Sequence, residues 1–497
     1  MTVSASLLFS HLCCPHRTSM DAFASPSLRE PVSPFISMLW ERGSLYESEV
    51  VGQLGVPFLD LSVSKGDEKE AKTRGAIARG DTLIYGGRLS IDELVGEPDL
   101  LRREGAGYVS IDIKSGGGTE GGDDDDDGKL KKTYGVQLAL YTDILERLGV
   151  SAGRYGYIHD VHGDEVRYDL DAPLGPRSSS IAEIYRDAKF QAERVLSGEL
   201  KTLPAACSVC GLCVWRSSCL KDMRTAGDLS LLPRLGRTTR DTLMPTFPTL
   251  KALASADLSA FLGGEKSPFP GVSAESLARF KVRAQLALDP NPKPFFREPV
   301  DLPTNRFEVF FDIEDDPLRD VVYLHGFVVR RDGDSATEQF VAVFAEDATE
   351  AAERGAFAAA WAFLSQHADH MVYYYSKHER TKYRQLQEKY PEVCSAADVE
   401  ALFSPGRSFD LYYDAVFNSE WPTMDWSIKS LAKFLKFRWR HADPSGAASI
   451  EWFDQWVRTN DPTIKQRIID YNEDDCRAMR VLVDAMREME FETLSNE

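Results

Sequence analysis

Asp112 and Lys114 stand two residues apart in the stretch YVSIDIKSG, residues 108–116, which has the apolar pattern of a strand that ends in glycines. At that spacing the two side chains leave the same face of the strand. A carboxylate beside a lysine suits phosphodiester hydrolysis, because the carboxylate can hold a divalent cation while the lysine orients water and offsets negative charge in the transition state. The pair alone is weak evidence, since an ordinary exposed ion pair has the same pattern.

Segments on either side of this pair carry residues that fit the same chemistry. Asp99, in GEPDLL, supplies a second acid on what we predict to be the preceding strand of a hairpin. Downstream, YGVQLALYTDILERLG at 134–149 has the periodicity of an amphipathic helix. Its Gln137 and Tyr141 are four residues apart and therefore share one face of that helix.

The order of these elements resembles the PD-(D/E)xK nucleases of the RecB type, in which a central sheet carries the acids at its edge. The resemblance rests on Pro-Asp at 98–99, then Asp-x-Lys on a strand, then Gln-xxx-Tyr on a helix. It implies a metal-dependent nuclease domain. The implied roles are Asp99 and Asp112 as Mg²⁺ or Mn²⁺ ligands, Lys114 as a catalytic residue, and Gln137 and Tyr141 beside the site and the nucleic-acid strand.

Nucleases of this type often have a histidine ligand on an upstream helix, and the matching stretch of this chain has none. That stretch, ERGSLYESEV at 41–50, contains Tyr46 and Glu47 instead. We therefore expect either that Glu47 replaces the histidine as a metal ligand or that the site lacks this ligand.

A cysteine cluster follows the helix. CSVCGLCVWRSSC, residues 207–219, holds four of the eight cysteines of the chain. Their spacing fits a tetrahedral zinc site and also an iron–sulfur cluster, since both take four thiolates. We expect a cytoplasmic protein, because the start of the chain reads poorly as a secretory signal and no apolar run has the length of a membrane span. In that reducing compartment a metal is favoured over disulfides.

Within the RecB-type nucleases, a subset that includes CRISPR-associated enzymes holds a 4Fe–4S cluster with one cysteine near the N-terminus and three after the Gln-xxx-Tyr helix. The triplet has a C-x2-C-x5-C-like pattern, which Cys210, Cys213 and Cys219 match. The resemblance implies that CCPHR supplies the fourth ligand, Cys14, with Cys13 as the alternative. Such a cluster would be a structural staple, and zinc remains the alternative metal.

The C-terminal part of the chain has a second group of acids. Asp312 and Glu314, in VFFDIEDD at 309–316, lie on one face of a predicted strand. Two carboxylates on a buried strand are costly unless they hold a cation. In DYNEDDCRAM at 470–479, Tyr471 and Asp475 are four residues apart on a predicted helix and share one face.

This second pattern resembles the DEDD exonucleases of the RNase H-like superfamily, in which four acids hold two Mg²⁺ ions and a tyrosine positions the attacking water. It resembles in particular the exonuclease module that follows a RecB-like domain in some bacterial fusion proteins, through YSKHE, SIKSLAKFL and YNEDDC. The resemblance implies Asp312, Glu314 and Asp475 as metal ligands and Tyr471 as the tyrosine. Glu379 stands where the family has an aspartate, and Asp410 is the other candidate for that place.

Between the two patterns, LLPRLGRTTRDTLM at 231–244 resembles a helix–hairpin–helix. In that motif a glycine-bearing turn offers backbone N–H groups to a phosphate. Arg234, Gly236 and Arg237 are therefore candidate nucleic-acid-binding residues. A small helical spacer without a binding role is the alternative interpretation.

The 497 residues must form several domains, since a single core rarely grows that large. We predict an α/β multidomain protein with a PD-(D/E)xK domain at 1–225, a helical helix–hairpin–helix-like segment at 226–287, a proline-rich linker at 288–306 and an RNase H-like domain at 307–497. The acidic stretch 116–132 reads as a solvated loop. In the last domain, we expect a β-hairpin at 306–330, helices at 350–366 and 378–389, strands at 370–376 and 408–413, and a helix from about 463.

The formal net charge of −20, to which the aspartates at 123–127 contribute, differs from the basic surface of most nucleic-acid-binding proteins. It does not exclude a nuclease, because nuclease sites are themselves built from carboxylates that bind divalent metal. The combined motifs predict a Mg²⁺- or Mn²⁺-dependent exonuclease with two separate sites, with DNA as the substrate and RNA as the alternative. The resemblance alone implies a role in repair, recombination or defence. The alternative is a nucleic-acid-binding scaffold with one or both sites inactive and structural zinc on the cysteines. No membrane partner is expected.

Overall fold

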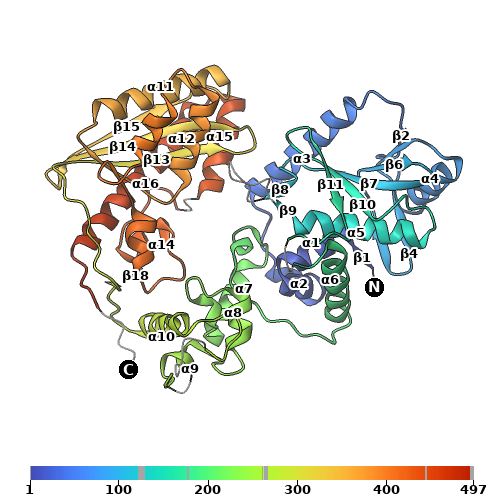
Figure 1. Ribbon diagram of the computed structural model, residues 1–497, viewed down its shortest axis with the longest axis horizontal. Coiled ribbons are helices and arrows are strands. Elements are labelled where there is room, and N and C mark those ends of the chain that lie inside the picture. The colour runs from blue at the N-terminus through green and yellow to red at the C-terminus, as the bar shows by residue number, and fades with distance from the viewer. Residues whose placement is uncertain are drawn as a thin grey trace. The chain divides into compact units, whose positions relative to one another are not determined.

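The structure is a computed structural model that describes residues 2–120, 129–175, 178–259, 261, 267–442 and 445–492. Its contacts divide the chain into two compact units, coloured blue to green and green to red in Figure 1. The first unit contains residues 1–204 and 208–220, and the second contains residues 205–207 and 221–497. Helix α7, Arg216–Ala226, includes the boundary.

The first unit is a mixed α/β structure, as the sequence predicts. Its strands are β1 Val3–Ser4, β2 Leu59–Asp60, β3 Leu83–Tyr85, β4 Leu89–Ile91, β5 Leu94–Gly96, β6 Leu100–Glu104, β7 Gly107–Ile113, β8 Thr119–Glu120, β9 Lys129–Leu130, β10 Tyr155–His159 and β11 Glu165–Asp169. Its helices are α1 Ala5–Cys13, α2 Pro15–Phe23, α3 Pro34–Gly52, α4 Gly66–Arg79, α5 Lys132–Arg147 and α6 Ile181–Leu196. The main sheet has the strand order β11-β10-β7-β6-β3-β2, and a smaller sheet has the order β1-β5-β4.

Strand β7 lies in the middle of the main sheet, and each of its residues is buried. It pairs antiparallel with β6, which forms the predicted hairpin, and parallel with β10. Helix α5 packs on this sheet and against α6, where Gly135 gives the two helices a close contact. The predicted solvated loop 116–132 is paired at its ends, where β8 and β9 are antiparallel, and residues 121–128 within it lie outside the described residues.

The second unit is built on a five-stranded sheet with the order β15-β14-β13-β16-β17. Its strands are β12 Phe295–Phe296, β13 Phe307–Asp316, β14 Val321–Arg331, β15 Asp334–Phe344, β16 Met371–Tyr374, β17 Ser408–Asp410 and β18 Ser419–Glu420. Its helices are α8 Gly236–Leu243, α9 Leu250–Ala254, α10 Ala274–Leu288, α11 Glu350–Gln366, α12 His378–Lys389, α13 Ala396–Leu402, α14 Ile428–Phe434, α15 Gly446–Thr459 and α16 Pro462–Arg487. The first three strands of the sheet are antiparallel, and β13, β16 and β17 are parallel.

Alternation along β13 decides which side chains face which helices. Val309, Phe311 and Ile313 pack with residues of α11, α12 and α13 on one face of the sheet. Phe310 faces the other side and packs with residues of α16. Asp312 and Glu314 have the same parity as Phe310, so the sequence spacing places both acids on the face that α16 covers.

The helical segment before this sheet has its own apolar core, built from residues of α8, α9 and α10. The proline-rich segment 288–306, predicted to be an extended connector, is partly packed. Its Phe295 and Phe296 are buried, and β12 pairs antiparallel with β18. The difference arises because this segment carries two adjacent phenylalanines among its prolines, and burying them outweighs chain stiffness.

The strand predicted at 408–413 is shorter than expected. Strand β17 ends at Asp410, and Leu411–Ala415 continue as a π-helical turn. The Asp410 carboxylate accepts hydrogen bonds from the backbone N–H groups of Tyr412 and Tyr413 at 2.9 and 3.1 Å. A side chain that bonds its own following backbone in this way competes with strand continuation.

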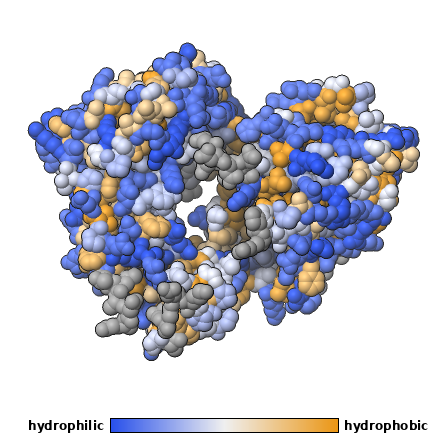
Figure 2. All heavy atoms as spheres, in the orientation of Figure 1, coloured by the Kyte–Doolittle hydropathy of each residue, from blue (hydrophilic) through white to orange (hydrophobic). Residues whose placement is uncertain are grey.

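On the face drawn in Figure 2, hydrophilic residues cover most of each unit, and apolar residues form small groups between them. In the parts of the chain that the structure describes, no helix combines the length and the apolar composition that a membrane crossing needs.

Gly135 provides a test of the α5–α6 packing. A Cβ atom there would lie 2.0 Å from Cδ1 of Ile181, so Gly135→Ala should lower the free energy of unfolding by about 1–3 kcal/mol through overpacking. Gly75→Ala is the matched control in α4, because its nearest neighbour is the flexible end of Arg79 at 3.4 Å. Urea-induced unfolding should show Gly75→Ala to be neutral or stabilising by up to about 1 kcal/mol. Equal effects of the two variants would contradict the close helix contact.

Candidate functional sites

The first candidate site lies where β6 and β7 meet. Asp99 directly precedes β6, and Leu100 pairs with Ile111 on β7, which puts Asp99 beside Asp112. The Asp99 Oδ2 atom accepts a hydrogen bond from the backbone N–H of Ile113 at 2.7 Å. The Lys114 Nζ lies 2.8 Å from Oδ2 of Asp112. The predicted pair and the second acid thus come together.

Burial sets the electrostatics of this first site. Asp112 is 1% exposed. Burial, with the nearby charge of Asp112, raises the pKa of Asp99 to about 8, and Glu47 adds to the shift. Burial works against the ammonium form of Lys114, yet Asp112 and Asp99 raise the pKa of that lysine above its ordinary value. Lys114 is therefore a fixed positive charge at neutral pH, suited to orienting a substrate phosphate rather than to removing a proton.

Helix α5 closes one side of the first site. Burial raises the pKa of the Tyr141 hydroxyl, and Asp112 and Asp99 are near enough to raise it further. Tyr134, which the sequence reasoning missed, places its ring 5.9 Å from the Nζ of Lys114. Gln137 lies between these two tyrosines on the helix and is half-buried. Its spacing from Tyr134, three residues, would have pointed to Tyr134 as a neighbour of the site.

Glu47 reaches the first site from α3. Its Oε1 accepts a hydrogen bond from the hydroxyl of Tyr85 at 3.0 Å, and its charge helps to raise the pKa of Asp99. Tyr46 points elsewhere, since its hydroxyl donates to the backbone carbonyl of Asp160. Of the two residues in place of a histidine, Glu47 is the one that lies near the acids.

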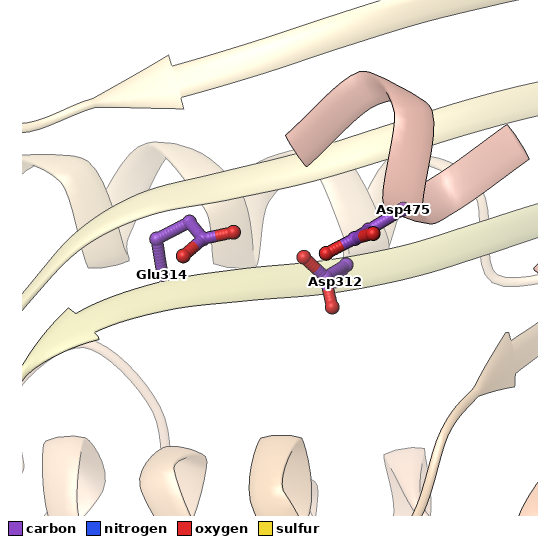
Figure 3. Close-up of side chains that lie close together, drawn as sticks. All are labelled: Asp312, Glu314 and Asp475. Carbon is purple, nitrogen blue, oxygen red and sulfur yellow. The ribbon is translucent and has the colours of Figure 1, made fainter. Parts of the chain in front are cut away.

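The second candidate site joins a strand and a helix. Oxygen atoms of Asp312, Glu314 and Asp475 lie within 4.8 Å of one another, the one such acidic group found among the described residues. Figure 3 shows Asp312 and Glu314 on the same side of β13 and Asp475 reaching toward them from α16. Both acids of the predicted Asp-x-Glu pair and the acid of the predicted Tyr-xxx-Asp pair therefore converge.

Neighbouring groups hold the acids of the second site in place. The side-chain amide of Asn472 donates to Oδ2 of Asp312 at 2.7 Å, and the indole N–H of Trp439 donates to Oδ1 of Asp475 at 2.7 Å. Lys429 lies 3.6 Å from Oδ2 of Asp475 and also donates to the hydroxyl of Tyr471. Tyr471, predicted to position water, is 2% exposed and is held by this lysine.

Negative charge exceeds positive charge at the second site. Burial raises the pKa of Asp312 well above its usual range, and Asp475 raises it further. Burial also raises the pKa of Glu314 and of Glu379, and the charge of Asp312 is the next largest cause for each. Glu379 is 3% exposed, and its Oε2 has no hydrogen-bond partner among the residues that the structure describes. Oxygen ligands with an unsatisfied buried acceptor are the donor set that hard divalent cations prefer, so the residues present fit a metal.

Asp410, the other candidate for the place of Glu379, has a different environment. Its Oδ1 accepts hydrogen bonds from three backbone N–H groups, those of Ser376, Tyr412 and Tyr413. These bonds fix the turn after β17 and occupy the carboxylate. Burial raises the pKa of Asp410, and these backbone donors counter that shift.

The Asn472 side chain packs against the sheet at Gly326, where the absence of a side chain makes room for it. Gly326 on β14 pairs directly with Asp312. A Cβ atom at Gly326 would lie 1.6 Å from Oδ1 of Asn472. The stretch YNEDDC hinted at this residue, because Asn472 and Asp475 are three apart on one helix face. Lys429 lies in SIKSLAKFL, one of the stretches that carry the resemblance, but no spacing related it to the acids, and Trp439 gave no local signal.

The cysteines lie at the end of the first unit. Burial raises the pKa of the Cys213 thiol, and Cys14 and Cys210 are near enough to add to the shift. The indole of Trp215 donates to Oδ1 of Asp21 at 2.8 Å, and the backbone N–H of Glu30 donates to the carbonyl of Val214 at 2.8 Å. These bonds attach the cysteine segment to α2 and the chain after it. Cys14, Cys210, Cys213 and Cys219 belong to the first unit, whereas Cys207 belongs to the second.

The residues of the predicted helix–hairpin–helix turn have separate environments. Arg234 has a left-handed backbone conformation, φ 62°, and its guanidinium lies 4.7 Å from the ring centre of Phe417. Gly236 begins α8 and is exposed, also with positive φ. The guanidinium of Arg237 donates to the carbonyl of Ala205 at 3.5 Å. Phosphate binding by this turn stays a prediction.

Comparison with family models gives two matches. Residues 59–220 match a model of the PD-(D/E)XK nuclease superfamily, and residues 309–487 match a model of the RNase H superfamily. A search of curated proteins gave no match. The predicted fold class is confirmed: a mixed α/β multidomain chain with a PD-(D/E)XK-like domain followed by an RNase H-like domain. Two nuclease-superfamily domains support a nuclease, and they imply a nucleic-acid substrate.

The contact between Gly326 and Asn472 predicts a coupled pair. Gly326→Ala should lower the free energy of unfolding by about 2–3 kcal/mol, because the new Cβ overlaps the Asn472 amide. Asn472→Ala should cost about 1–2 kcal/mol, since it removes a hydrogen bond to Asp312. The double variant should be more stable than Gly326→Ala alone. Urea-induced unfolding measures all three, with Gly355→Ala, which has open space around its Cβ, as the control. Additive effects would contradict the contact.

Proposed function

We propose that this chain is a divalent-metal-dependent nuclease that hydrolyses phosphodiester bonds at two separate sites, one in each nuclease-like domain. The convergence of Asp312, Glu314 and Asp475 to within 4.8 Å is the observation that carries the proposal. Three acids with one nearby lysine repel one another and lower the stability of the fold, so a purely structural role would not explain them. A divalent cation between them would offset this repulsion and would take part in phosphodiester hydrolysis.

At the RNase H-like site, Asp312, Glu314 and Asp475 would hold the metal, with Glu379 as a further ligand. A bound Mg²⁺ or Mn²⁺ supplies Lewis acidity and positive charge at the scissile phosphate. Asn472 and Trp439 keep Asp312 and Asp475 in place through hydrogen bonds. Lys429 positions the Tyr471 hydroxyl beside the acids, where it can orient the attacking water.

At the PD-(D/E)XK-like site, Asp99 and Asp112 would hold the metal, with Glu47 as the candidate third ligand. Lys114 remains charged and faces the phosphate, where it offsets the negative charge that develops as water attacks phosphorus. The bond from phosphorus to the leaving alcohol then breaks, which leaves a phosphate monoester and a hydroxyl. Gln137 and Tyr141 border the strand on the α5 side.

The substrate and setting follow from the resemblance to RecB-type and DEDD nucleases. Both groups commonly trim ends, so DNA is the proposed substrate, digested from an end, in repair, recombination or defence. We place the protein in the cytoplasm, where its half-buried thiols stay reduced.

Two substitutions test the proposed sites separately. Asp112→Asn and Asp312→Asn each remove a ligand charge with little change in shape, and each should lower the cleavage by its own site at least about 100-fold. Labelled single- and double-stranded DNA and RNA with Mg²⁺ or Mn²⁺ provide the assay, and the double variant should be inactive. Asp92→Asn and Asp332→Asn are matched controls, because both aspartates are exposed in turns with positive φ, which asparagine tolerates.

Three outcomes are decisive for this proposal. Cleavage that survives both site substitutions would refute the assigned residues. No cleavage by the unaltered protein on any substrate would favour a nucleic-acid-binding scaffold. Cleavage of RNA alone would overturn the assignment of DNA.

The cysteines are proposed to hold a 4Fe–4S cluster through Cys14, Cys210, Cys213 and Cys219. Two observations support this ligand set. Cys14 and Cys210 lie near the Cys213 thiol, and the cysteine segment is attached to the region after α2. A metal there would pin the start of the unit to its end. Structural zinc at the same thiols is the alternative, and Cys13 the alternative to Cys14.

Metal content tests the ligand set. Anaerobically purified protein should be brown and absorb near ~400 nm if thiolates ligate iron–sulfur. Cys14→Ser should lose the metal, whereas Cys207→Ser, which changes a cysteine of the other unit, should retain it. Iron, sulfide and zinc analysis of each variant is the measurement. A colourless protein with stoichiometric zinc excludes the cluster, and the opposite pattern of metal loss excludes Cys14 as a ligand.

A further inference from the structure

A cavity of about 220 Å³ in the second unit has an unusual concentration of positive charge. Among the described residues, four arginines and three aromatic rings line it, and no carboxylate does. The residues that matter here are Arg234, Arg279, Arg283, Arg297, Phe417 and Trp426. They come from the turn before α8, from α10, from the chain after β12 and from the segment on either side of β18.

Two of these arginines are buried and share one counter-ion. The side chains of Arg283 and Arg297 are 5% and 6% exposed, and that of Glu420 is 0% exposed. Arg283 makes two hydrogen bonds with the Glu420 carboxylate, at 2.6 and 3.1 Å. The Arg297 Nε lies 3.1 Å from the same carboxylate but makes no aligned hydrogen bond within the described parts of the chain, so this donor is buried and unsatisfied there.

Among the described residues, Arg297 and the arginines around it outnumber the neighbouring acids. Burial lowers the pKa of the Arg297 guanidinium, and the neighbouring Arg279 and Arg283 lower it further. Glu420 and Glu298 oppose this shift. Arg279 is itself paired with Glu275, an exposed residue on the same helix. Burying cations in this way is costly unless an anion compensates them.

Arg234 is held at the cavity by a strained backbone. Its φ of 62° is uncommon for a residue with a side chain and strains the backbone. The guanidinium stacks over Phe417 at 4.7 Å, and that of Arg283 lies 4.6 Å from the ring centre of Trp426. The carbonyl of Pro233 accepts a hydrogen bond from Arg283 at 3.0 Å, which ties the turn to the buried cluster. Strain of this kind is characteristic of ligand-binding positions.

We propose that this cavity binds the terminal phosphate of a nucleic-acid strand. Guanidinium groups match phosphate oxygens in bidentate geometry, and a phosphate monoester carries about −1.5 to −2 charges at neutral pH. The dianion offsets the excess of arginines over Glu420 better than the single charge of an internal phosphodiester. Anion binding by the cavity is independent of catalysis, but the assignment to a nucleic-acid strand rests on the proposed function.

The test uses the full chain with Asp112→Asn and Asp312→Asn, which prevents digestion during binding. Fluorescence anisotropy compares one single-stranded DNA with a 5′-phosphate, a 3′-phosphate or hydroxyls at both ends. One phosphorylated form should bind at least about 10-fold tighter than the hydroxyl form, and inorganic phosphate should compete. Arg234→Gln and Arg279→Gln should abolish this preference. They replace side chains that are not fully buried, so folding is preserved.

Arg306→Gln is the matched control, because this arginine is 66% exposed and lies outside the cavity lining. Equal affinities for phosphate and hydroxyl ends, with no competition by inorganic phosphate, would overturn the proposal even if the unaltered protein cleaves DNA. If the unaltered protein cleaves nothing, yet inorganic phosphate raises its melting temperature and Arg234→Gln removes that shift, the anion site stands and the nuclease proposal fails.

Discussion

Acids that are buried close to one another, with too little positive charge beside them, are the constraint on which both units depend. In each unit the sheet brings an acid on a strand close to an acid from a neighbouring segment, Asp112 to Asp99 and Asp312 to Asp475, and their ionised forms repel. That repulsion must be outweighed by packing, and the apolar layers on both faces of β13 supply it in the second unit. The fold therefore holds mutually repelling acids at both sites, and a divalent cation is the partner that we propose relieves this repulsion.

The two sites meet this constraint by different routes. In the first unit the compensating cation, Lys114, comes two residues after Asp112, so local strand geometry places it. In the second unit the compensating Lys429 belongs to α14 and reaches Asp475 on α16 only when distant segments pack. Local rearrangement of the chain should therefore disturb the second site more easily than the first, because more independent elements must be in place for it to form.

This difference also explains how far the sequence predicted the structure. Asp112 with Lys114 and Asp312 with Glu314 were recognisable because period-two spacing on a strand is a local signal. The convergence of Asp475 required a resemblance, since nothing local relates residue 475 to residue 312. Trp439 and Tyr85 were missed, because a hydrogen bond from a distant aromatic leaves no periodic trace. The sequence did not predict that segment 288–306 is partly packed, because its prolines indicate an extended connector. The burial of its two phenylalanines outweighs that tendency.

The bonds from Trp215 to Asp21 and from Glu30 to Val214 bear on the order in which the protein is made. They close the first unit across up to 194 residues, so the unit cannot be completed until its last segment has been synthesised. At about 5–20 residues per second, the first helices wait roughly 10–40 s for their partner. Throughout that interval Cys13 and Cys14 are on a growing chain without the segment that flanks them in the finished unit. These two thiols therefore spend that interval without part of the burial that they have in the finished unit, and a reducing environment would protect them from oxidation.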